Sequence, residues 1–193
     1  MSGRTRARKL AAIKEYFRFL VGSGVIAVSP TESVSAPKRE RNGRNYLTPE
    51  EYTRLLSLAG SNPRDYAILQ VFLQTGIWVS ELCSLTLSDV DLADRTLTIR
   101  QGKGMADRSI ELEKKGYQAI KNYLRSRPQS LSDALFLNYQ AEPLSERGVQ
   151  KLLAKYVKLA GITKKISPHS LRHTFATYKA GGARSWQSPP LQE

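Results

Sequence analysis

Residues 90–112 read VDLADRTLTIRQGKGMADRSIEL, and this stretch decides the fold class. Leu97 and Ile99 alternate with polar neighbours, and Ile110 and Leu112 alternate in the same way after a Gly-Lys-Gly turn. A period of two is typical of strands with one buried face. The stretch therefore predicts a β-hairpin that belongs to a small antiparallel sheet.

The sequence on both sides of this hairpin has helical periodicity. Thr48 and Glu51 are spaced as a capping box with Pro49 at the first helical position, which predicts a helix through about Ala59. Apolar residues that recur every three or four positions, with glycine or proline at the ends, predict further helices at 63–75, 79–85, 113–126, 145–160 and 167–180. Helices, a small sheet and helices again predict an α+β, mostly helical domain.

The chain divides by composition into three parts. Residues 1–44 carry ten basic and three acidic side chains, and contain one amphipathic helix and a polar run with the composition of a basic linker. Because one helix cannot bury its apolar face alone, we expect this segment to be the end of a domain whose beginning is absent. Residues 45–180 hold the regular patterns. Residues 181–193 lack periodicity and are predicted to be a disordered tail.

The overall composition favours an anionic partner. Thirty Lys and Arg residues against 17 Asp and Glu give a net charge of +13 and a pI near 10.0. Nucleic acid is the commonest partner of such proteins, although ribosomal, chromatin and membrane-surface proteins share the signature. The single cysteine, Cys83, cannot form an intrachain disulfide, and no segment has the length and apolarity of a membrane span. These features predict a soluble, cytoplasmic protein without a membrane partner.

Residues 167–178 read SPHSLRHTFATY and carry the strongest candidate site. His169, Arg172 and His173 stand at i, i+3 and i+4, on one face of the predicted helix near its N-terminus. Donors and the helix dipole favour an anion such as phosphate there. A metal site is the competing interpretation. It is disfavoured because Arg172 would repel a cation, and the chain has no HExxH motif or cysteine pair. The helix alone does not decide between an anion site and two surface histidines.

Two weaker candidates precede this helix. Lys103 lies between glycines at the hairpin tip, from which it could grip a phosphate or donate a proton. Glu81 lies on the predicted short helix among apolar neighbours. Each has an ordinary alternative, since lysine and glycine are common in turns and glutamate is common near helix starts.

Four blocks in this order resemble the tyrosine recombinase family, which includes phage and transposon integrases and Xer-type enzymes. They are LTPEE at 47–51, TG-x-x-x-SEL at 75–82, Gly-Lys-Gly at 102–104 and His-x-x-Arg-His at 169–173. The resemblance implies that 45–180 is most of a catalytic domain. It also implies that 1–44 is a remnant of the family's core-binding domain with its linker.

The resemblance also implies a chemistry that uses no metal and no other cofactor. In this family a tyrosine attacks a DNA phosphodiester and forms a 3′-phosphotyrosyl bond. Carried over by position, His169 and Arg172 hold the phosphate, Lys103 is the general acid and Glu81 supports the site. His173 is a local structural partner. The implied partners are double-stranded DNA and other recombinase protomers. The expected DNA-binding residues are Arg39, Arg41, Arg44, Lys103, Arg108 and Arg172.

Two departures from the family pattern predict a DNA-binding protein that does not cut DNA. The family's first arginine is replaced by Trp78, whose indole has one neutral donor and no charge. The chain also ends 21 residues after Arg172 without the family's later histidine or tryptophan block and tyrosine, and Tyr178 is expected to face the core. Two alternatives are an active recombinase that takes its tyrosine from another chain and a non-catalytic DNA-binding regulator.

Overall fold

The computed structural model describes residues 3–36, 45–100 and 106–180. The chain divides into two compact units, residues 1–44 and 45–193, and each is described by itself. Within the described ranges, no helix combines the length and the apolar composition that crossing a bilayer requires.

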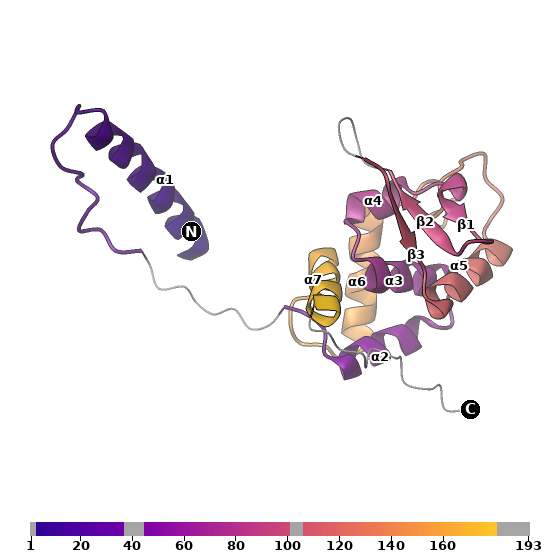
Figure 1. Cartoon of the computed structure of the whole chain (residues 1–193). Helices are drawn as coiled ribbons and strands as arrows, with labels where there is room; N and C mark the ends of the chain where they lie inside the picture. The colour runs from indigo at the N-terminus through magenta and orange to yellow at the C-terminus, as the bar shows by residue number, and fades with distance from the viewer. Residues whose placement is uncertain (1–2, 37–44, 101–105, 181–193) are drawn as a thin grey trace. The chain divides into compact units, whose positions relative to one another are not determined.

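The first unit is built on the helix α1 (Gly3–Gly22), followed by turns and irregular chain up to residue 36 (Figure 1). The predicted amphipathic helix is thus present. Three of its large apolar side chains are exposed, Ile13 by 46%, Tyr16 by 60% and Phe19 by 67%. The others on its apolar stripe are half-buried: Leu10, Phe17, Leu20 and Val21. A single helix offers no second layer against which these side chains could pack.

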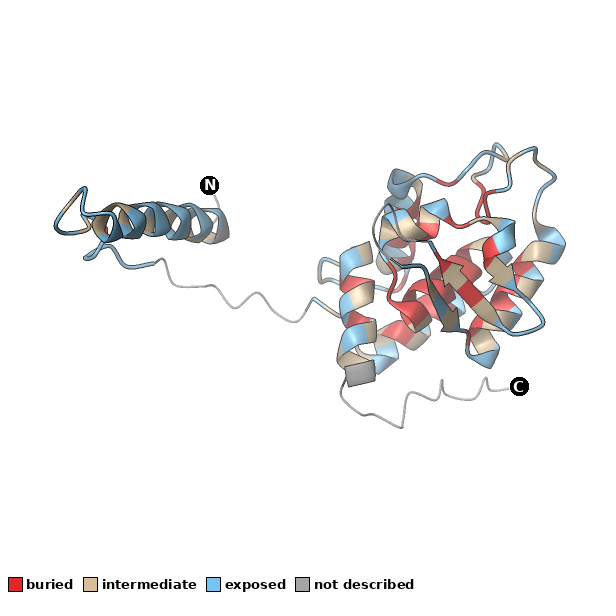
Figure 2. Cartoon of the chain, turned by 45° about the horizontal axis from the view of Figure 1, so that its top comes forward, coloured by how far each residue is buried: buried red, intermediate tan, exposed pale blue. Residues whose placement is uncertain are grey.

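The second unit is organised around the helix α3, which packs against α2, α5 and α7. Nine of its residues are buried, and the ribbon in Figure 2 is accordingly red at the centre of the unit. The remaining helices lie around this core. The helices of the unit are α2 (Pro49–Ala59), α3 (Pro63–Thr75), α4 (Val79–Ser84), α5 (Lys114–Ser126), α6 (Glu146–Leu159) and α7 (Pro168–Ala180), with a 3₁₀ turn η1 (Leu87–Asp89).

The predicted hairpin is part of an antiparallel sheet in the order β1-β2-β3 (Figure 1). Its strands are β1 (Val90–Asp91), β2 (Thr96–Ile99) and β3 (Arg108–Glu111). Leu97 pairs with Ile110 in the register between β2 and β3, so the two alternating runs face each other as expected. The α+β, mostly helical class is therefore confirmed.

Local signals fix the ends of the first helices. The backbone N–H of Thr48 donates to Glu51 Oε2 at 2.7 Å and the N–H of Glu51 to Thr48 Oγ1 at 3.3 Å, which is the predicted capping box of α2. α3 ends at Gly76, which has a left-handed φ of 59°. A Cβ at Gly76 would lie 2.2 Å from Cδ1 of Phe175, so glycine also allows α7 to approach.

The last helix, α7, is tied to the first residues of the unit. The Leu47 N–H donates to Thr174 Oγ1 at 3.0 Å, and the Tyr178 hydroxyl donates to the Leu47 carbonyl at 2.9 Å. Leu171 is fully buried and Thr174 is 1% exposed. The helix is thus held by its core face and by polar contacts to residue 47, which fixes the position of its remaining side chains.

Candidate phosphate-binding site

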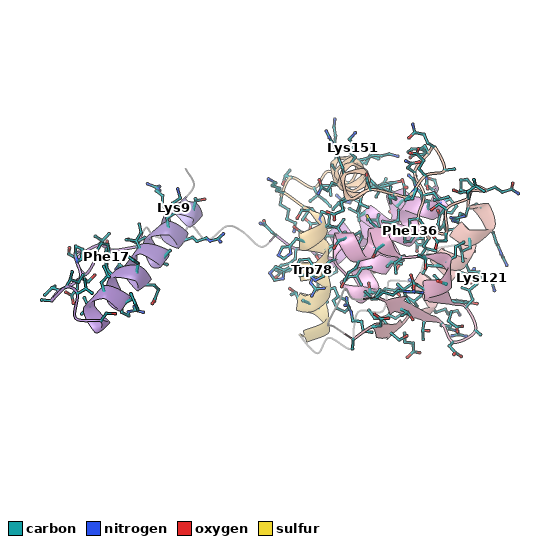
Figure 3. The ribbon with its side chains drawn as sticks, turned by 90° about the horizontal axis from the view of Figure 1, so that it is seen from above. Lys9, Phe17, Trp78, Lys121, Phe136 and Lys151 are labelled. Carbon is teal, nitrogen blue, oxygen red and sulfur yellow. The ribbon has the colours of Figure 1, made fainter. Side chains whose placement is uncertain are left out.

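The three predicted site residues of α7, His169, Arg172 and His173, do not form one cluster. Arg172 Nη1 donates to the Gly76 carbonyl, and its Cζ lies 4.6 Å from the ring centroid of Trp78. The His169 ring is stacked on the same indole, with centroids 6.0 Å apart and planes 25° from parallel. Figure 3 shows Trp78 against α7. His169 and Arg172 therefore meet at Trp78.

His173 departs from the expectation of one shared face. Its ring lies 5.9 Å from that of Tyr46, and its Nδ1 is 3.4 Å from Thr177 Oγ1. The reason is geometric: neighbouring residues on an α-helix are rotated by about 100°, so Arg172 and His173 diverge although each is near His169. The described contacts of His173 are thus with Tyr46 and Thr177, and the local structural role that the resemblance implies for it stays a prediction.

Glu81 holds an arginine from the sheet. Its two carboxylate oxygens accept from Arg108 Nη1 at 2.9 Å and Nη2 at 2.8 Å, and Oε2 also accepts from the Trp78 backbone N–H at 2.7 Å. Burial alone would raise the pKa of Glu81. The hydrogen bonds from Arg108 and Trp78, together with the positive charges of Arg108 and Arg172, outweigh burial and hold that pKa below its usual value. Glu81 is therefore an ionised anchor that orients the Arg108 fork.

This ion pair could not be predicted from the sequence. Glu81 and Arg108 were each singled out, but nothing in a spacing of 27 residues indicates that they meet. The contact exists because β3 leads from the hairpin back past the start of α4.

Trp78, Glu81, Arg108 and Arg172 line one open pocket of about 770 Å³, and His169 and His173 are not among its lining residues. Its lining residues belong to the end of α3, the region of α4, the sheet and α7. Three arginines and one glutamate give it a positive surplus, which favours an anionic ligand. Arg100 additionally pairs with Asp89 at 2.6 Å. The lining residues are Thr75, Trp78, Ser80, Glu81, Ser84, Arg100, Arg108, Arg172, Phe175 and Ala176.

Among the described residues, no tyrosine lines this pocket. The Tyr178 hydroxyl donates a hydrogen bond to the Leu47 carbonyl. Burial is the main cause that raises the pKa of Tyr178, and negative charge from Tyr46, Glu50 and Glu51 raises it further. The side chain is thus a structural hydrogen-bond donor with a poorly ionised oxygen.

Several predicted residues lie outside the described part of the chain: Lys103, Arg39, Arg41, Arg44 and the segment 181–193. Within the described ranges, no group of three or more histidine, cysteine or carboxylate side chains is placed to hold a metal ion.

The family profile and the similar known proteins point to the same family. The sequence profile of the phage integrase family matches residues 45–180. The chain is 37% identical over 186 residues to the tyrosine recombinase XerC of Thermodesulfovibrio yellowstonii, covering 90% of this chain and 62% of the relative. It is 36% identical over 189 residues to XerC of Bacillus subtilis, covering 92% and 62%. The chain thus spans about three fifths of the length of these relatives.

Solved structures agree with this assignment. The crystal structure of XerA recombinase matches with a TM-score of 0.67 and 30% identity, covering 87% of this chain and 67% of that one. The Tn1549 transposon integrase, solved in complex with circular intermediate DNA, matches in fold with a TM-score of 0.75 at 22% identity, covering 96% and 69%. From the profile match over more than half of its length and these relatives, the chain belongs to the phage integrase family of tyrosine recombinases.

Proposed function

We propose that this chain binds double-stranded DNA through its phosphates and forms no covalent bond to DNA with a tyrosine of its own. The observation that carries the proposal is the pocket in which Arg172 and Arg108 meet, from two elements 64 positions apart in sequence. Planar guanidinium forks suit phosphate oxygens, and the His169 ring stacks on the same indole as the Arg172 guanidinium. The net charge of +13 supplies the long-range attraction.

The same pocket supports the second half of the proposal. Trp78 stands where the family pattern has an arginine, so one charge that would meet the transition state is replaced by a neutral indole. Tyr178, the last tyrosine of the chain, is bonded to Leu47 on the far end of α7 from His169. A nucleophile must lie in line with the scissile phosphate, and a side chain fixed on the rigid helix that carries Arg172 cannot swing there.

Relatives support a DNA partner. The Tn1549 integrase was solved with DNA, and the λ integrase was solved as a dimer bound to a core site. We extend this to residues 45–180 and to protomers that share one DNA. We also propose that residues 1–44 are part of the second DNA-contacting unit, because α1 combines exposed aromatic side chains with Arg6, Arg8 and Lys9.

A binding titration tests the phosphate site. Arg172→Gln should weaken binding to a labelled duplex and lower the slope of log affinity against log salt by about one unit. The matched control is Arg125→Gln, an exposed arginine on α5 outside the pocket, which should change the slope much less. Arg172→Lys keeps the charge and should keep most of the slope. Equal effects of the two glutamine variants would contradict a site at Arg172.

A suicide substrate tests the absence of covalent chemistry. The unmodified protein and Trp78→Arg should both give no detergent-stable protein–DNA adduct, because the arginine restores a clamp but no nucleophile. An adduct that Tyr178→Phe abolishes would make Tyr178 the nucleophile and overturn the proposal. An adduct that appears only when a relative with an intact tyrosine is added would favour donation of the tyrosine by another chain.

A further inference from the structure

Trp78 has a large apolar side chain that is ordered by its contacts and yet half exposed to solvent. It is 49% exposed. Its backbone is fixed by the hydrogen bond to Glu81, and its ring rests on the Arg172 guanidinium and the His169 imidazole. A ring that is already ordered loses little conformational entropy when a ligand packs on it. The indole is therefore a pre-organised apolar surface.

The surroundings of this indole distinguish it from the other exposed hydrophobic side chains of the second unit. None of those others lines the pocket that contains Arg100, Arg108 and Arg172. They are Leu58, Leu87, Leu92, Leu131, Tyr139 and Leu159. Tyr139, the other exposed aromatic side chain described in the second unit, has the Arg64 guanidinium 4.3 Å from its ring centroid, whereas Trp78 shares a pocket with three arginines.

The chemistry that fits both features is a nucleotide. A nucleobase has a flat apolar face that stacks on an indole, and the phosphate attached to it carries the charge that an arginine binds. A base inside an intact duplex is stacked between its neighbours and cannot offer that face. An unpaired base at a gap can offer it.

We propose that Trp78 is a stacking platform for an unpaired nucleobase whose adjoining phosphate is bound by Arg172 and Arg108. The proposal rests on the proposed function, because it requires that DNA enters this pocket. It adds a ligand preference. An arginine at position 78 would bind only the phosphates of the DNA backbone, whereas tryptophan there also selects DNA with an unpaired base.

The test uses the full chain with Trp186→Phe, so that Trp78 is the one remaining tryptophan of the two in the sequence. Affinity for an intact duplex and for the same duplex with a short single-stranded gap is measured by anisotropy of labelled DNA. Tryptophan fluorescence is recorded in the same titration. We expect about tenfold tighter binding to gapped DNA, with quenching of Trp78 on binding.

Two controls separate stacking from the greater flexibility of gapped DNA. A gap made of abasic nucleotides has the same phosphates and similar flexibility but no bases, and it should lose the preference. Trp78→Leu should lose the preference, measured as the ratio of its affinities for gapped and intact duplex, whereas Trp78→Phe should retain part of that ratio.

The outcomes are distinct. If Trp78→Leu retains the preference, or if the abasic gap binds as tightly as the normal one, the stacking proposal is wrong. Intact duplex bound without any preference for the gap also refutes stacking and leaves the proposed function standing. No binding to either DNA at low salt would refute the proposed function itself.

Discussion

At the scale of single residues, the arginines of the pocket differ in how far their charge is neutralised. Arg100 and Arg108 each face a carboxylate, Asp89 and Glu81 respectively. The Arg172 contacts with the Gly76 carbonyl and the indole of Trp78 involve neutral groups. A phosphate therefore meets the largest unbalanced charge at Arg172, which is why its removal should affect binding more than the removal of a neighbour.

Gly76 should be the glycine whose replacement costs most. Gly76→Ala combines a left-handed φ of 59° with a Cβ 2.2 Å from Phe175, whereas Gly161→Ala has a similar φ of 65° with open space around the new atom. We expect a loss of about 1 to 2 kcal/mol for Gly161→Ala and about 1 to 3 kcal/mol more for Gly76→Ala. Thermal unfolding of both variants measures the difference, and equal losses would show that the Phe175 contact is unimportant.

Cys83 should react slowly with thiol reagents. Burial is the main cause that raises its pKa to about 11, with a contribution from the charge of Glu146. At pH 8 about one thiol in a thousand is then ionised, compared with roughly a quarter of the molecules for an ordinary cysteine thiol. Alkylation of the native protein should therefore be at least about a hundredfold slower than that of the urea-unfolded protein. Similar rates in both states would show that the half-buried position of Cys83 does not protect its thiol.

At the scale of elements, α7 explains what the sequence could and could not predict. Its existence and its N-terminus followed from Ser167 and Pro168, and its apolar positions followed from helical spacing. The division of its polar side chains did not, because it depends on what lies opposite: Trp78 beside Arg172, and Tyr46 beside His173. Helical periodicity predicts the face of the helix on which a residue lies. The residues that it contacts on that face depend on the tertiary fold.

The polar contact between α7 and Leu47 should be essential for stability. Thr174→Val removes the acceptor of the buried Leu47 N–H, which leaves that group unsatisfied at a cost of about 1 to 3 kcal/mol. Thr177→Val, one turn later and more exposed, is the matched control and should cost much less. Denaturant unfolding of both variants measures the difference. A neutral Thr174→Val would mean that water satisfies the N–H instead.

At the scale of the whole molecule, composition predicted the class of partner and the ordered motifs predicted the family and fold. The short strand β1 was not foreseen, since two residues are too few for a period to appear. The pairing of Glu81 with Arg108 and the packing around Trp78 were also missed, because each joins segments that only the folded chain brings together. The sequence thus allowed individual site residues to be predicted, whereas their contacts with one another became known only from the folded structure.

The basic segment at 38–44 should contribute to DNA affinity through contacts of its own arginines with phosphates. Replacing Arg39, Arg41 and Arg44 by glutamine should lower the slope of log affinity against log salt by about two to three units. A charge-matched control replaces Lys114, Lys121 and Arg125 on α5, none of which lines the pocket. Anisotropy between about 50 and 200 mM salt measures both slopes. Equal decreases would assign the effect to net charge rather than to the segment.

The bonds between Leu47 and α7 also constrain how the protein is made. Leu47 leaves the ribosome 127 residues before Thr174 and 131 before Tyr178. At 5 to 20 residues per second, its partners arrive roughly 6 to 25 s later. During that time the inner surface of α3 that α7 covers lies open on the nascent chain, where chaperones and proteases can reach it. We therefore expect ribosome-bound chains that stop before α7 to be cut readily by added protease, and chains extended far enough to release α7 from the exit tunnel to resist.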